Sequence, residues 1–163
     1  MKFRDKVLSS ENLTRWREEL RGSGRKLVVT NGVFDILHVG HATYLEAARN
    51  LGDALLVGIT CDHGVRELKG PTRPLNIEND RAAVLAALES VSAVYIFPET
   101  TAFNFLQQVQ PDIYVKGGDY TIDTINQDER HLIEQMGGRI EILPGVAGKS
   151  TTGLVDKIAG HGV

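Results

Sequence analysis

Thr30-Asn31-Gly32-Val33-Phe34-Asp35-Ile36-Leu37-His38-Val39-Gly40-His41 is the stretch that decides the fold, because it joins a predicted strand to a predicted helix. The apolar residues 27–29 before it favour a short buried strand, and residues 42–48 after it have the composition of a helix. The first turn of a helix offers free backbone N–H groups and the positive end of the helix dipole. The junction is therefore suited to binding phosphate.

Two histidines, His38 and His41, lie at this junction, three residues apart with a glycine between them. Imidazoles at this spacing share one side of a helix, and both can donate a hydrogen bond to one phosphoryl group. The alternative is a pair of histidines that only cap the helix. The whole pattern Gly-x-Phe-Asp-x-x-His-x-Gly-His after a strand favours a nucleotide site over that alternative.

Outward from this junction, apolar runs alternate with amphipathic segments along the whole chain. Strands are expected at about 26–30, 53–60, 93–97, 112–115 and 139–143, and helices at about 9–21, 42–48, 77–89 and 127–136, with two more after residues 100–101 and 150–152. Residues 66–74, with two prolines and a glycine, are expected to form a loop. The pattern predicts a single Rossmann-like, doubly wound α/β domain over residues 1–163, with a five-stranded parallel sheet and a helical segment, 1–24, packed on it.

Ligands of such sheets bind beyond the carboxyl ends of the strands. Polar and glycine-rich segments follow four of the predicted strands: residues 31–41, Asp62 with the loop 66–74, residues 116–120 and residues 145–152. Residues 148–151, Gly-Lys-Ser-Thr, invite comparison with a phosphate-binding P-loop, but the preceding glycine, Gly145, is two positions too close. We interpret residues 150–152 as an anion site at a helix start.

Composition limits the classes of protein that fit. The chain has 163 residues, a length suited to one domain, and its net charge of −3 argues against a protein that neutralises nucleic-acid phosphates. No apolar run approaches the ~20 residues of a membrane span, and no secretory signal is predicted. Cys61 is the single cysteine, and the other histidines have no metal-ligand spacing beside it. We expect a cytoplasmic protein without a membrane or nucleic-acid partner.

His38-Val39-Gly40-His41, preceded by Gly32-Val33-Phe34-Asp35, resembles the His-x-Gly-His signature of the nucleotidyltransferase superfamily, which includes the cytidylyltransferases. Residues 115–120 and 150–152 resemble the branch that adenylylates D-glycero-β-D-manno-heptose 1-phosphate. Glycerol-3-phosphate cytidylyltransferases usually have an arginine in the segment that matches 145–152 and Gly-Asp-Asp where this chain has Gly117-Gly118-Asp119. Both departures favour the heptose branch.

The resemblance implies transfer of a nucleoside monophosphate from ATP to a sugar 1-phosphate, with release of pyrophosphate. It leaves two alternatives: a cytidylyltransferase for glycerol 3-phosphate or another alcohol phosphate, and a non-catalytic nucleotide-binding regulator. Mg²⁺ is expected to arrive with the triphosphate, with no protein ligand assigned. A homodimer is expected by resemblance, as is a separate sugar kinase that supplies the substrate.

The predicted site residues fall into three groups. Catalytic residues are His38, His41 and Lys69; nucleotide-binding residues are Asn31, Gly32, Val33, Phe34, Gly40, Lys116, Gly118, Asp119, Ser150, Thr151 and Thr152; substrate-phosphate-binding residues are Arg73, Arg81 and Asp35. Solvated surface charge is the alternative for Lys69 and Arg73, and a surface ion pair for Arg81. Asp35 would repel a triphosphate unless it organises the loop or a metal, so a turn residue is the alternative there.

Overall fold

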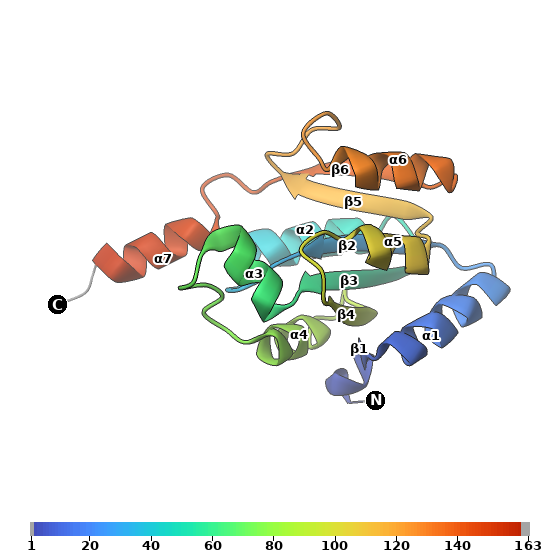
Figure 1. Ribbon diagram of the computed structural model, residues 1–163, viewed down its shortest axis with the longest axis horizontal. Coiled ribbons are helices and arrows are strands. Elements are labelled where there is room, and N and C mark those ends of the chain that lie inside the picture. Colours follow the sequence, from blue (N-terminus) through green and yellow to red (C-terminus); the bar gives the residue numbers. More distant parts are fainter. Residues whose placement is uncertain (1, 161–163) are drawn as a thin grey trace.

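One parallel sheet of six strands runs through residues 2–160, the part of the chain that the computed structural model describes (Figure 1). The strands are β1 (Val7–Leu8), β2 (Leu27–Gly32), β3 (Ala54–Thr60), β4 (Ala93–Phe97), β5 (Ile113–Gly118) and β6 (Arg139–Pro144). Their order is β1-β4-β3-β2-β5-β6, and every neighbouring pair is parallel. Residues 1 and 161–163 of the predicted domain lie outside the described residues.

The predicted α/β class and parallel sheet are confirmed, but the predicted count of five strands is wrong. The additional strand is β1, where Val7 pairs with Val94 and Leu8 with Tyr95 of β4. Two apolar residues are too short a run for a periodicity argument to detect. The strand forms because the edge of β4 offers N–H and C=O groups that an extended segment can pair with.

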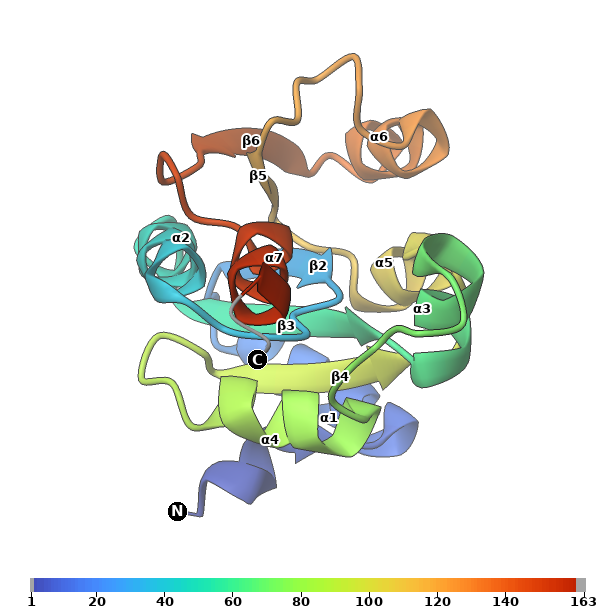
Figure 2. The same ribbon diagram turned by 90° about the vertical axis from the view of Figure 1, so that its left-hand side faces the viewer.

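Helices cover both faces of the sheet (Figure 2). They are α1 (Ser10–Gly22), α2 (Val39–Arg49), α3 (Asp62–Lys69), α4 (Glu78–Ala86), α5 (Phe103–Val109), α6 (Gln127–Gln135) and α7 (Thr151–Gly160), with a 3₁₀ turn at Phe3–Lys6. Leu13 of α1, Phe105 of α5 and Ile133 of α6 join the core on one face. Leu45 of α2 and Leu85 of α4 join the core on the other. Because helices cover both faces, every residue of β3 is buried.

Helix α3 corrects the loop predicted over residues 66–74, because the helix continues through Lys69. Its start is capped by Cys61, whose Sγ accepts a hydrogen bond from the backbone N–H of Gly64 at 3.4 Å. The helix ends at Gly70, whose φ of 96° lies in the left-handed region that favours glycine. Lys69 is therefore positioned by a helix end.

The strand order reverses at β2. From β2 the chain crosses to β3 and then β4 on one side, and later places β5 on the other side of β2. The crevice outside the carboxyl ends of β2 and β5 is where open parallel sheets bind ligands. Helices α3 and α7 lie toward this end of the sheet, and α7 projects from the body of the domain (Figure 1).

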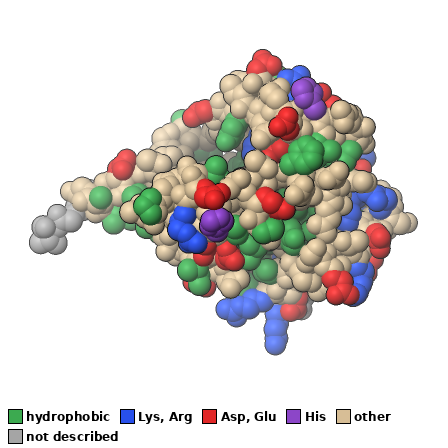
Figure 3. Space-filling model, viewed as in Figure 1, with side chains coloured by type: hydrophobic (Ala, Val, Ile, Leu, Met, Phe, Trp, Pro, Cys, Tyr) green, Lys and Arg blue, Asp and Glu red, His purple; other side chains and the backbone are tan. Residues whose placement is uncertain are grey.

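The surface carries charges of both signs. Acidic and basic side chains are interspersed over the face in Figure 3, in keeping with the net charge of −3. Within residues 2–160, no helix has both the length and the apolar composition that crossing a membrane requires.

Candidate active site

A cavity of about 690 Å³ opens at the carboxyl ends of β2 and β5. The segment after β2, the end of α3, the segment before α5, the end of β5 and the segment before α7 all contribute to its walls. Of the predicted site residues, it brings together Asn31, Gly32, Val33, Phe34, Asp35, His38, Gly40, His41, Lys69, Arg73, Lys116, Gly118, Ser150 and Thr151. Predicted site residues from four separate segments thus meet at the carboxyl ends of the strands, where the sequence predicts the site.

His38 and His41 lie side by side at the start of α2, with 4.0 Å between their ring centroids. Nδ1 of His38 accepts a hydrogen bond from the backbone N–H of Gly40 at 3.1 Å, and Nδ1 of His41 accepts one from the backbone N–H of His38 at 3.3 Å. A neutral imidazole whose Nδ1 accepts a hydrogen bond carries its proton on Nε2. Both rings therefore offer an Nε2–H donor to a ligand.

Both histidines are held in the neutral form. Burial, and then the neighbouring His38, lower the pKa of His41 to about 4. Burial, and then the charge of Lys149, lower the pKa of His38 below its ordinary value. At neutral pH the pair can donate hydrogen bonds but supplies little positive charge. The charge that balances a bound polyphosphate must come from other side chains.

Two glycines leave room for the rings of the site. The backbone at Phe34 has a φ of 51°, an unusual conformation for a bulky residue, and its ring centroid lies 5.4 Å from that of His41. A Cβ added at Gly32 would lie 3.0 Å from Cε2 of Phe34. A Cβ added at Gly40 would lie 2.8 Å from Cε1 of His38, so glycine between the two histidines keeps the ring of His38 in place.

Asp35 organises a loop, which corrects its predicted role as a phosphate ligand. Its side chain is 1% exposed and accepts hydrogen bonds from Nε of Arg73 at 2.8 Å and from the backbone N–H groups of Leu75 and Asn76. Burial alone raises the pKa of this carboxyl, but the hydrogen bonds from Asn76, Leu75 and Arg73 outweigh burial and hold the pKa below its ordinary value. A buried anion with occupied oxygens repels phosphate. Asp35 instead holds residues 73–76 against the segment after β2.

Arg81, predicted to bind substrate phosphate, lies buried behind the site, and that prediction is wrong. Its donors bind O of Asn76 at 3.0 Å, O of Val33 at 2.7 Å, O of Thr60 at 2.9 Å and Oδ1 of Asp62 at 2.8 Å. The side chain has no exposed surface. Arg81 therefore fixes the segments that follow β2 and β3. An arginine in the first turn of an amphipathic helix gives no sign in the sequence that it points inward.

Asp119 and Thr152 are exposed and do not line the cavity. Their neighbours do: Oγ of Ser150 accepts a hydrogen bond from the backbone N–H of Gly153 at 2.9 Å and caps α7. Oγ1 of Thr151 donates to O of Ile36 at 3.2 Å. The amino end of α7 is thus attached to the segment that carries the histidines.

A polar cluster under the cavity escaped prediction. Glu129 of α6 is buried, and its carboxylate accepts hydrogen bonds from the backbone N–H of Ala102 and the hydroxyl of Tyr114, both at 2.9 Å. Nζ of Lys116 donates to Oδ1 of Asn31 at 3.2 Å. Burial lowers the pKa of Lys116, against the opposing effect of Glu129. Glu129 lies far from every motif in the sequence, so no signal indicates it.

Tyr44 also lines the cavity without having been predicted. Its hydroxyl donates to O of Val115 at 3.1 Å and lies 2.6 Å from Oγ1 of Thr30. Tyr44 therefore links α2 to both strands of the crevice. It follows His41 by three residues, and this helical spacing is the signal that could have found it.

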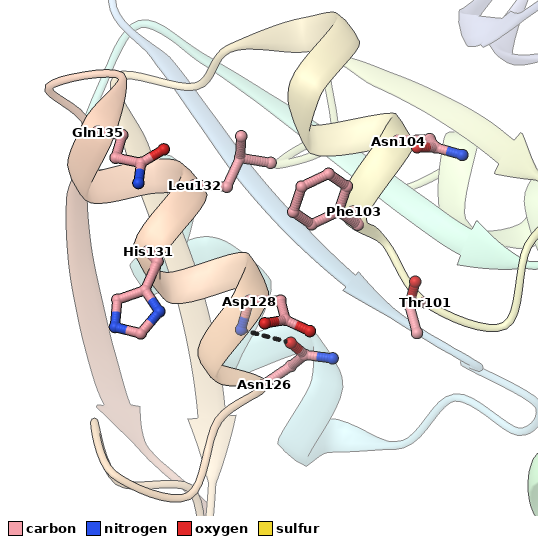
Figure 4. Close-up of a pocket in the computed structure, with 8 residues that line it drawn as sticks. All are labelled: Thr101, Phe103, Asn104, Asn126, Asp128, His131, Leu132 and Gln135. Atoms are coloured by element: carbon pink, nitrogen blue, oxygen red, sulfur yellow. Dashed lines mark hydrogen bonds between the residues drawn. The ribbon is translucent and has the colours of Figure 1, made fainter.

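A second hollow, of about 580 Å³, lies between α5 and α6 and shares Thr101 and Asn126 with the first. Phe103 and Leu132 point toward one another across it, and the amide of Asn126 accepts a hydrogen bond from the backbone N–H of Asp128 at 3.0 Å (Figure 4). Its lining contains no lysine or arginine from the described part of the chain. This hollow is less suited to phosphate than the first.

Open parallel sheets with a ligand cavity at the point where the strand order reverses form a class of α/β domains, and this chain has that fold and that cavity. Comparison with known families narrows the class. Residues 29–144 match the Cytidylyltransferase-like family, and the chain belongs to this family. This match confirms the superfamily that the His-x-Gly-His resemblance predicts.

Several curated relatives carry the name Bifunctional protein HldE. The chain is 44% identical over 155 residues to the protein from Methylobacillus flagellatus, 48% over 155 residues to that from Pseudomonas entomophila, and 50% over 135 residues to that from Geotalea uraniireducens. These matches cover 95%, 95% and 83% of this chain, but 31%, 32% and 27% of the relatives. The chain thus spans about a third of the length of these relatives.

Two solved structures are similar in fold. The lipopolysaccharide core biosynthesis protein from Thermoplasma volcanium superposes with a TM-score of 0.63 and 31% identity over 76% of this chain and 98% of that one. Pantoate-beta-alanine ligase from Francisella tularensis superposes with a TM-score of 0.58 over 93% of this chain and 77% of that one. The latter is 15% identical and shows the fold alone.

Proposed function

We propose that the chain transfers the nucleoside monophosphate of ATP to D-glycero-D-manno-heptose 1-phosphate and releases pyrophosphate. The pair formed by His38 and His41 carries the proposal. Its two neutral rings expose Nε2–H donors at a helix start, inside a cavity large enough for a nucleotide. Such donors match the oxygens of a phosphoryl group in transfer.

The reaction is a displacement at the α-phosphorus. An ionised oxygen of the sugar phosphate attacks, the bond from the α-phosphorus to the bridging oxygen breaks, and pyrophosphate leaves with the electron pair. The attacking oxygen is already ionised near neutral pH, so no side-chain nucleophile is needed. Catalysis then depends on positioning and on stabilising the charge that develops.

Each wall of the cavity has a part in this reaction. His38 and His41 donate to the α- and β-phosphate oxygens, and the amino end of α7 at Ser150 adds further phosphate contacts. Lys69 and Arg73 face the incoming sugar phosphate. The glycine-rich end of β5 lets the backbone approach the base and ribose. Mg²⁺ bound with ATP would neutralise charge, held mostly by phosphate and water; no group of three metal-ligating side chains occurs within residues 2–160.

Two observations support heptose 1-phosphate as the proposed acceptor substrate. Residues 115–120 and 150–152 resemble the heptose branch of the superfamily, and β5 and α7 bring parts of both segments to the cavity. The Thermoplasma protein, at 31% identity, is described as a lipopolysaccharide core biosynthesis protein, which suits an enzyme that activates a sugar for a glycan.

Pyrophosphate release tests the proposal. ATP, CTP and GTP are each combined with heptose 1-phosphate and glycerol 3-phosphate, and each product is identified by mass. We expect turnover with ATP and heptose 1-phosphate. Turnover only with CTP and glycerol 3-phosphate would establish the cytidylyltransferase alternative. Binding of ATP without pyrophosphate release from any pair would favour the regulator.

The role of His41 has its own test. His41→Ala removes one phosphate donor and should lower kcat by on the order of 10²-fold or more. His63→Ala is the matched control, because His63 is 71% exposed on α3 and pairs only with Glu67 in the described structure. Unchanged turnover of His41→Ala would refute the assignment.

A further inference from the structure

Lys149 is a cation of the cavity wall to which neither the sequence motifs nor the proposed mechanism gives a role. It stands between Gly148, whose φ is 71°, and Ser150, which caps α7. Its side chain is exposed and lines the cavity. Among residues 2–160, no acidic side chain pairs with it. Lys149 is therefore available to an anionic ligand.

The stem of Lys149 packs beside the first turn of α2. A Cβ added at Gly40 would lie 3.3 Å from Cβ of Lys149 and 2.9 Å from Nδ1 of His38. Gly40 thus lies between the His38 ring and the Lys149 stem. The proximity has an electrostatic consequence, since burial and then the charge of Lys149 lower the pKa of His38. Lys149 and His38 therefore border the same part of the cavity.

The other cations of the cavity are mostly engaged by the protein. Arg73 pairs with the buried carboxylate of Asp35. Lys116 donates to Asn31 and is influenced by the charge of Glu129. Lys69, at the end of α3, has no ion-pair partner among the described residues. Lys69 and Lys149 are the cations of the wall that remain unopposed, and they come from different segments.

A nucleoside triphosphate brings several negative charges, while the histidines supply hydrogen bonds with little charge. We propose that Lys149 binds the β- and γ-phosphates of the nucleotide and, after transfer, the pyrophosphate that leaves. This inference rests on the proposed function for the identity of the ligand. A charge-assisted contact beside neutral donors would stabilise the leaving group as its charge grows.

Titration calorimetry tests whether Lys149 contacts the β- and γ-phosphates or affects the binding of any nucleotide. Inorganic tripolyphosphate, ATP and AMP are titrated into the unmodified protein, Lys149→Met and Lys149→Arg. Loss of one charge-assisted contact should weaken tripolyphosphate and ATP binding by about tenfold in Lys149→Met. AMP binding should stay unchanged, and Lys149→Arg should keep most of the affinity. Lys26→Met is the control, because Lys26 precedes β2 at the opposite edge of the sheet.

Equal affinity of the unmodified protein and Lys149→Met for tripolyphosphate would overturn the proposal. An equal loss for AMP would also overturn it, because the effect would then not depend on the β- and γ-phosphates. These titrations need no turnover. If no sugar phosphate is a substrate but Lys149→Met weakens tripolyphosphate binding, the proposed function falls and the role of Lys149 stands.

Discussion

Replacement of Gly117 by alanine tests whether Tyr44 positions the histidine helix. A Cβ at Gly117 would collide with Cε2 of the Tyr44 ring and would lie 2.7 Å from its Cδ2. The ring cannot move freely, because its hydroxyl contacts Val115 and Thr30. Overpacking of this kind costs about 1–3 kcal/mol. The strain should push α2 away from the sheet and take His41 with it.

The expected consequence for catalysis is larger than that for stability. A displacement of about 1 Å at a reacting group can cost on the order of 10²-fold in rate. Gly117→Ala should therefore lower kcat by about 10- to 100-fold while the protein remains folded. Steady-state pyrophosphate release and urea unfolding measure the two effects separately.

A double-mutant cycle makes the reasoning refutable. Tyr44→Ala removes the ring, so adding Gly117→Ala to that variant should lower the free energy of unfolding little further. The two substitutions should therefore show a coupling free energy of unfolding of about 1–3 kcal/mol. Gly118→Ala is the matched control. Gly118 has a φ of 78° but no atom within 4 Å of an added Cβ, so its cost comes from the backbone and should add to that of Tyr44→Ala. Additive free energies for Gly117→Ala and Tyr44→Ala would show that the contact does not restrain the helix.

Two further predictions concern the corrected residues. Arg81→Lys should lower the free energy of unfolding in urea by about 3 kcal/mol or more, because buried carbonyl groups lose their donors. Lys69→Met is the control and should leave the free energy of unfolding unchanged. Lost turnover of Arg81→Lys at unchanged stability would restore a phosphate-binding role for Arg81. Folding holds the pKa of Asp35 below its ordinary value of 3.8. The ionised carboxylate therefore stabilises the folded protein above that pH, and this contribution to the free energy of unfolding is lost as the pH falls through the lower pKa of the native state. The unfolding free-energy difference between the unmodified protein and Asp35→Asn should therefore shrink below about pH 3.8, and a difference constant down to pH 2 would contradict this.

The sequence predicts those features whose cause is local. The apolar run of β3 predicts a strand buried on both faces because a parallel strand meets helices on each side. The glycine-rich segment 116–120 predicts a close approach of the backbone to a ligand, and Gly117 and Gly118 line the cavity. Glu129 and Arg81 could not be predicted in the same way, because their partners lie in segments distant in sequence. Arg81 bonds to residues 5 to 48 positions away, and such pairing depends on the finished topology.

The buried and the exposed charged residues of the site have different electrostatic roles. Asp35 and Arg73 neutralise one another, and the charge of Arg81 is directed at backbone carbonyls and Asp62. The protein thus uses its most buried charges to fix the loops, where lost hydrogen bonds would be costly. Lys69 and Lys149 at the cavity wall have no ion-pair partner among the described residues and are available to the ligand. Because the histidines are neutral, substituting Lys149 should weaken polyphosphate binding, substituting Lys69 should weaken sugar-phosphate binding, and substituting a histidine should mainly slow transfer.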